Sequence, residues 1–299
     1  MSKTTSPEES IAVRKRLKWA PALWGILILA VAQGFTFYVA FQERDFVEAN
    51  QITPPEVSLG IPLAYFFGAV ALLGVILFFV PLSKLKIAFR IMFALLFSWG
   101  VFIVLGLSLP VLPASLISIA TSLIWLFKPR LWLHNSLMLF ALVSIGSVFG
   151  FLLSPWVAMS FMLVVSIYDI LSVRFGYMLW LVKKLSEFET LPAFVIPRKI
   201  PDWNLNLREV GFKKLLEDRE VEREFSILGG GDIGFPLLLT VSVFFAYEFA
   251  SSLILAASSL LGLVAVYWIQ AVFLKGKPMA ALPPITFACL VGFLIVCFV

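Results

Sequence analysis

The sequence predicts an all-α fold, a bundle of membrane-spanning helices. Hydrophobic residues make up 61% of the 299-residue chain, and charged residues make up only 14%. A soluble domain contains roughly 45–50% apolar residues and could not bury this much apolar surface. The apolar residues also fall into runs of about 17–25, the length that a helix needs to cross roughly 30 Å of hydrocarbon. We therefore expect a polytopic membrane protein with about nine transmembrane helices.

Nine apolar runs are long enough to be spans, and most of the links between them are short. The first six cover approximately residues 20–41, 59–81, 88–108, 111–127, 133–152 and 155–180, and the last three cover 227–248, 251–273 and 281–299. The long link, residues 183–225, divides the chain into a six-helix part (1–182), a loop, and a three-helix part (226–299).

The distribution of basic residues predicts how the chain is inserted. Five lysines and arginines precede the first span, which is too long for a signal-peptide core and is expected to stay uncleaved. The links after the second, fourth, sixth and eighth spans are also basic, whereas the link after the first is mostly acidic. Basic residues collect in cytoplasmic links, so we expect a cytoplasmic N-terminus, an extracellular C-terminus and a location in the cell membrane. The same pattern explains the net charge of +5 without nucleic acid as a partner.

The long link differs in composition from the rest of the chain. It holds nine basic and nine acidic residues together with three prolines. Such a segment cannot lie in hydrocarbon, so we expect a cytoplasmic loop. Its second half, Arg208 to Phe225, is rich in Glu, Lys, Arg and Leu, which favour helix, and predicts a short surface helix.

Metal and cofactor chemistry finds no support in the sequence. The chain has one histidine, His134, and two cysteines, Cys289 and Cys297, which lie in the last apolar run. This set has neither the number nor the spacing of a metal site. We therefore expect no metal and no cofactor.

Most of the 18 acidic residues lie in the N-terminal tail, the first outer link or the long loop. The three exceptions are Asp169, Asp232 and Glu248, and Glu248 is close enough to the outer end of its span to reach water. An acid inside the bilayer costs roughly 2.5–3.5 kcal/mol, so it normally faces a polar cavity and has a functional role. Asp169 and Asp232 are therefore the candidate functional pair.

These two aspartates belong to consecutive antiparallel spans on either side of the long loop. Arg174 lies about 7–8 Å along the helix from Asp169 and can reach the cytoplasmic interface, so Asp169 lies in the cytoplasmic half of the membrane. Asp232 follows the charged end of the loop closely and lies at a similar depth. Two carboxyl groups in contact share one proton near neutral pH. One can act as a base on water and the other as an acid on a carbonyl, which is aspartic-protease chemistry, and the sequence leaves both assignments open.

The residues around the two aspartates are less specific. Gly229, Gly230 and Gly231 lie just before the second aspartate and allow the backbone of a substrate strand to approach closely, although they equally suit a flexible hinge. Tyr168 can hydrogen-bond within a membrane, but a tyrosine in a span is more often packing than catalytic. Pro283 breaks the entrance to the last span and either frees backbone groups that line a cavity or forms a plain kink.

Three short motifs in a fixed order connect these residues to a known family. They are Tyr168-Asp169 in the sixth span, Gly229-Gly230-Gly231-Asp232 in the seventh, and Ala281-Leu282-Pro283 at the start of the ninth. In this combination the chain resembles the presenilin and signal peptide peptidase family over essentially its whole length, and it is most similar to an archaeal presenilin homologue. The resemblance implies that Asp169 and Asp232 are the catalytic pair, and that Ala281 and Leu282 shape the site beside them. The family has Pro-Ala-Leu where this chain has Ala280-Ala281-Leu282.

We therefore expect an intramembrane aspartyl endopeptidase that cleaves transmembrane-helix segments of other proteins in the lipid bilayer, either alone or as a homo-oligomer. The apolar stretch Phe225 to Leu228 is expected to offer a strand edge to the unwound substrate. With the family as a guide, the expected substrates are single-span segments whose N-terminus is outside.

Three alternatives to a protease remain. The same carboxylates serve a proton- or cation-coupled transporter, or they belong to a non-enzymatic chaperone or peptide-binding scaffold. In the third alternative, both aspartates have only a structural role and form ion pairs with Arg174 or Lys183.

Overall fold

The computed structural model describes residues 7–80, 82–177, 180–181, 190–208, 225–274 and 279–298. Within these residues the chain forms eight α-helices, a short 3-10 helix and two strands. The helices are α1 (Pro7–Ala49), α2 (Gly60–Phe79), α3 (Leu82–Gly106), α4 (Val111–Phe127), α5 (Leu131–Leu152), α6 (Pro155–Arg174), α9 (Gly230–Val272) and α10 (Leu282–Phe298). The strands are β1 (Ala193–Pro197) and β2 (Phe225–Gly229), and the 3-10 helix is η1 (Ile200–Asn204).

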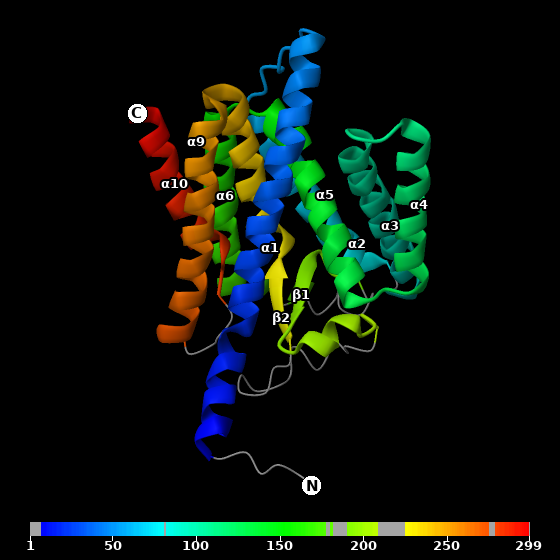
Figure 1. Ribbon diagram of the computed structural model, residues 1–299, viewed down its shortest axis with the longest axis vertical. Helices are drawn as coiled ribbons and strands as arrows, with labels where there is room; N and C mark the ends of the chain where they lie inside the picture. Colours follow the sequence, from blue (N-terminus) through cyan, green and yellow to red (C-terminus); the bar gives the residue numbers. More distant parts are fainter. Residues whose placement is uncertain are drawn as a thin grey trace.

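The apolar helices match the predicted membrane spans in position. Six helices in the described residues, α1, α2, α3, α5, α6 and α9, are long and apolar enough to cross a membrane, and α4 and α10 are shorter apolar helices. They stand side by side as a bundle, with the two strands at the end of the bundle nearest the N-terminus (Figure 1). The prediction of a polytopic helix bundle is therefore confirmed at the level of the fold.

Two helix ends differ from the predicted spans. Helix α1 continues to Ala49, so part of the acidic segment expected in an outer link is helical. An i,i+4 ion pair at 3.8 Å between Arg44 and Glu48 supports these last turns. Helix α6 ends at Arg174 rather than at residue 180. Phe175 is its C-cap residue, and Gly176, the next residue, takes a positive φ of 75°, as is common just beyond a helix C-terminus.

Helix α9 contains both the seventh and the eighth predicted spans. Its backbone leaves the helical conformation at Tyr247 and Glu248, where Glu248 has φ 68° and ψ 178°. Figure 1 shows the helix turning back at the end of the bundle that lies away from the strands. Glu248 is exposed at this turn, as its position near a span end predicted.

A two-stranded sheet accompanies the predicted helices. The strands pair antiparallel, with Phe194 opposite Leu228 and Val195 opposite Ile227. Strand β2 replaces the expected start of the seventh span at residue 227, because aromatic and β-branched residues favour strand and the glycines that follow disfavour an earlier helix start. Most of the surface helix predicted over Arg208 to Phe225, residues 209–224, lies outside the described residues.

The centre of the bundle is formed by α5 and the first arm of α9. Gly146 and Gly150 of α5 lie one turn apart and face Leu237 and Val241 of α9 so closely that a Cβ on either glycine would fall within 3.0 Å of that helix. Small residues at this spacing allow two membrane helices to pack backbone to backbone. Helix α2 differs, since only 6% of its span is buried inside the protein.

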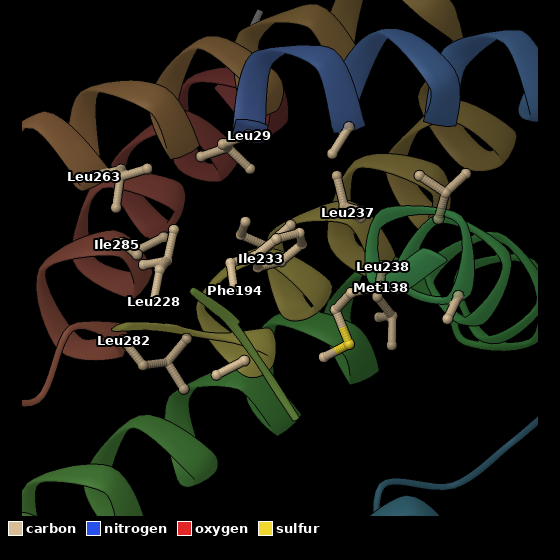
Figure 2. Packing of buried hydrophobic residues seen from close by; sticks show 14 of the residues in the cluster. Leu29, Met138, Phe194, Leu228, Ile233, Leu237, Leu238, Leu263, Leu282 and Ile285 are labelled. Atoms are coloured by element: carbon tan, nitrogen blue, oxygen red, sulfur yellow. The ribbon is translucent and has the colours of Figure 1, made fainter. Parts of the chain in front are cut away.

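The strands are part of this core rather than an appendage. The side chains of Phe194 in β1 and Leu228 in β2 point among Ile233, Leu263 and Ile285 from α9 and α10 (Figure 2). Phe194 is fully buried and Leu228 is only 4% exposed. The core therefore fixes the sheet against the helices that carry the candidate site.

Candidate active site

Asp169 lies near the C-terminal end of α6, where it meets the start of α10. Its side chain is partly buried, and its Oδ2 accepts a hydrogen bond of 3.3 Å from the backbone N–H of Leu282. Leu282 is the first residue of α10, so this N–H has no partner within its own helix. The next two residues are prolines without an N–H, and proline is well tolerated in a first helical turn. The sequence thus leaves a single N–H at the positive end of a helix facing the carboxyl group.

Asp232 is held by the junction between β2 and α9. It is the third residue of α9, and the backbone of Gly229, the N-cap residue, hydrogen-bonds its carboxyl group. This is the geometry of a capping box, in which an acidic side chain at the third helical position binds the N–H of the cap residue. A Cβ on Gly229 would lie 2.9 Å from Oδ2 of Asp232, so only glycine leaves the carboxyl group its present position.

The structure brings the two aspartates together although they are far apart in sequence. They lie near enough for the charge of Asp169 to act on Asp232. Arg174 forms no ion pair with either of them within the described residues, and Lys183 lies outside that part of the chain. The two carboxyl groups are thus close enough to interact electrostatically and have backbone N–H groups as partners, an arrangement suited to general acid–base chemistry on a bound water.

The other predicted site residues occupy several different places. Gly230 packs under the start of β1, since its Cβ would lie 2.9 Å from Pro192 O, and its N–H donates to the same oxygen at 3.0 Å. Gly231 is exposed, and its Cβ would first meet the Phe235 ring at 3.1 Å. Ala281 and Pro283 flank Leu282 and are partly buried.

The side chain of Tyr168 packs against α2. Its ring makes edge contacts with Phe66 and Phe67, at centroid distances of 5.8 and 5.7 Å. It also lines an open apolar groove of about 770 Å³, together with Tyr177 and apolar residues of α2 such as Phe67 and Val70. This placement favours packing over catalysis for Tyr168.

Sequence reasoning missed two polar residues that hold the sheet. His134 and Asn135 at the start of α5 hydrogen-bond the backbone of β1, at 3.1 Å to Ala193 O and at 2.8 and 3.0 Å to Val195. The signal in the sequence is a pair of adjacent polar residues at the beginning of an apolar span, of which His134 alone enters the metal argument. Among the described residues no cluster of ligand side chains fits a metal ion.

Comparison with known proteins identifies the family. The family model described as signal-peptide peptidase, presenilin aspartyl protease matches residues 24–299. Two solved structures of a presenilin family intramembrane aspartate protease, in space groups C222 and P2, share the fold with TM-scores of 0.63 and 0.58. They are 18% and 19% identical to this chain, and the alignments cover 93% and 94% of it and 99% and 98% of theirs. No curated protein sequence matches the chain.

These similarities do not favour the transport hypothesis. The family model extends over nearly the whole chain and includes both aspartates. The protein therefore belongs to the signal-peptide peptidase and presenilin aspartyl protease family, as a multi-pass membrane enzyme that is an intramembrane aspartic endopeptidase of the presenilin type.

Proposed function

We propose that Asp169 and Asp232 form a catalytic dyad that hydrolyses peptide bonds within the transmembrane segments of other membrane proteins. The observation that carries this proposal is the meeting of two acidic side chains from α6 and α9, each supported by a backbone N–H. A structural acid in a membrane protein is normally neutralised by a cation, and the described residues offer none here.

In the proposed reaction the dyad holds one proton between two carboxyl groups. The ionised carboxylate removes a proton from a water molecule while the protonated carboxyl donates a hydrogen bond to the scissile carbonyl oxygen. Attack by the water oxygen gives a tetrahedral intermediate, which breaks to a new carboxyl and a new amine as a proton passes to the leaving nitrogen. The N–H groups of Leu282 and Gly229 keep both carboxyl groups oriented during these transfers.

Strand β2 supplies the surface on which the substrate is held. Gly230 N–H donates to Pro192 O, and hydrogen-bonded and non-bonded pairs alternate in an antiparallel ladder. The pair Val195 and Ile227 is therefore a non-bonded pair, so the N–H and C=O of Ile227 face away from β1. An unwound substrate segment adds as a further strand to this edge, which no strand occupies in the described part of the chain, and so brings its next residues toward Asp232.

The membrane orientation follows from the charges of the links. With the N-terminus in the cytoplasm, the dyad lies in the cytoplasmic half of the membrane, since Asp169 is near the C-terminal end of α6 and Asp232 is in the first turn of α9, directly after β2. The sheet lies at the end of the bundle nearest the N-terminus (Figure 1). With this orientation and the family as a guide, the proposed substrates are single-span segments with an external N-terminus. The open apolar groove lined by α2, Tyr168 and Tyr177 offers such a helix a docking surface beside α6.

The dyad is tested with a single-span reporter peptide and the purified full-length protein in detergent or lipid. Cleavage by the parent enzyme should disappear in both Asp169→Asn and Asp232→Asn, because neither variant can share the proton. Mass spectrometry of the products should place the new ends within the transmembrane segment. Cleavage that persists in either variant would remove the dyad, and solute uptake without new peptide ends would support the transporter instead.

The strand edge is tested by replacing Ile227. Ile227→Pro removes the outward N–H while the ladder bonds to β1 are kept, so it should lower kcat/KM by roughly ten-fold with little loss of stability. Ile227→Ala, which keeps the N–H and loses only side-chain contacts, is the matched control. Equal cleavage by Ile227→Pro and the control would reject pairing at this edge.

A further inference from the structure

The outer edge of β1 is closed by side chains instead of by a third strand. In β1 the backbone groups of Ala193 and Val195 face away from β2, as the register requires. Asn135 receives the Val195 N–H at its Oδ1, at 3.0 Å, and donates from its Nδ2 to Val195 O, at 2.8 Å. His134 reaches Ala193 O from Nε2, at 3.1 Å. The asparagine amide therefore offers β1 the same donor and acceptor as the peptide group of a neighbouring strand.

Both side chains are built into the core. His134 is fully buried and Asn135 is 5% exposed. Because a carbonyl oxygen only accepts, Nε2 of His134 is the donor, and Trp125 stacks on its ring at a centroid distance of 6.0 Å. A two-stranded sheet alone is marginal at best, so these contacts supply what a third strand would otherwise give.

The start of α5 also holds the segment that follows β1. Leu131 N–H donates to Leu205 O at 3.0 Å, and Leu207 N–H donates to Pro129 O at 2.7 Å. One helix end thus fixes both β1 and the chain beyond it. Strand β2 reaches α5 through β1, and β2 carries the free edge at Ile227 and continues into the helix of Asp232.

We propose that Asn135, supported by His134, is a positioning residue for substrate binding, which anchors β1 to α5 so that the Ile227 edge of β2 is ordered before the substrate arrives. This inference rests on the proposed function, because it concerns the strand edge that receives the substrate. No hydrogen bond connects Asn135 to either aspartate within the described residues. Its effect is to reduce the ordering that binding would otherwise require.

The test measures kcat and KM separately for Asn135→Leu in the full-length enzyme. Loss of both hydrogen bonds should raise KM roughly five-fold, whereas kcat should stay near that of the parent because the dyad and the Leu282 N–H are untouched. Ser144→Ala is the matched control. Ser144 is also buried on α5 but donates to Gly100 O, at 2.8 Å, and does not hydrogen-bond the sheet.

A double-mutant cycle separates positioning from general destabilisation. If Asn135 acts through the edge of β2, the rise in KM caused by Asn135→Leu should vanish in an Ile227→Pro background. Additive effects in the cycle, or the same change in KM for Ser144→Ala, would overturn the inference. Asn135→Ala serves as the smaller replacement if the leucine does not fit the site.

A second measurement does not depend on turnover. Hydrogen exchange followed by mass spectrometry should show faster exchange in the peptide that contains Ala193–Pro197 of Asn135→Leu, with unchanged exchange in the central turns of α5 and α9. Unchanged exchange in β1 would contradict the anchoring role. Failure of the proposed function has a different signature, since the parent enzyme would then not cleave, or its cleavage would survive Asp169→Asn.

Discussion

The two aspartates of the site are held by different means. Asp232 is fixed locally, by the cap residue three positions before it in the same strand-to-helix junction. Asp169 is fixed from a distance, by the first N–H of a helix 113 residues further along the chain. In both cases a backbone N–H at a helix N-terminus donates to the carboxyl group. The two aspartates therefore have chemically similar surroundings, although one contact is local and the other is long-range.

The two hydrogen bonds differ in what must form before them. The bond to Asp232 forms as soon as β2 and the first turn of α9 form, because its partners are neighbours in sequence. The bond to Asp169 requires α6 and α10 to pack together. The hydrogen bond to Asp169 can therefore be lost without unfolding a helix. The position of the Asp232 carboxyl group is instead most sensitive to an atom added at the cap residue.

Among the variants that change the surroundings of the two aspartates, Gly229→Ala should lower kcat most. Gly229 has φ −60° and ψ 141°, a conformation that alanine adopts without strain, so Gly229→Ala acts only through its new Cβ. That Cβ would lie 2.9 Å from Oδ2 of Asp232 and must displace the carboxyl group. A displacement approaching 1 Å should lower kcat on the order of 100-fold. The measurement is kcat for reporter cleavage at saturating substrate.

Gly231→Ala is the control within the same glycine run. Its Cβ would first meet the edge of the Phe235 ring, which can turn aside, and alanine favours the helix that begins at Gly230. Its kcat should therefore remain within about two-fold of the parent. Equal losses in the two variants would mean that the glycine run acts through flexibility, as in the hinge interpretation, and not through the space beside Asp232.

The contrast between local and long-range contacts also explains what the sequence could predict. Hydropathy depends on composition within one segment, so the positions of the apolar helices and of the two intramembrane aspartates could be predicted from the sequence. The strand at Phe225–Leu228 could also be predicted, because it too depends on local composition. Strand β1 was not predicted, because its five residues lie in a polar loop and are stabilised by α5, about 60 positions earlier in the chain. The hydrogen bond from the Leu282 N–H to Asp169 was not predicted either, although the family resemblance implied that Leu282 lies beside the pair.

Removing the donor to Asp169 should have a smaller effect than crowding Asp232. Leu282→Pro deletes the N–H at a first helical position that tolerates proline, and it should lower kcat roughly ten-fold, the value of about one hydrogen bond to a charged group. Leu282→Ala keeps the N–H but loses the same buried side chain, so the ratio of kcat between the two variants isolates the donor. The predicted order is parent, Leu282→Ala, Leu282→Pro and then Gly229→Ala, measured with one reporter at one pH. If Leu282→Pro instead equals Leu282→Ala, then Asp169 needs no backbone donor, and the likeness between the two halves of the site is structural rather than chemical.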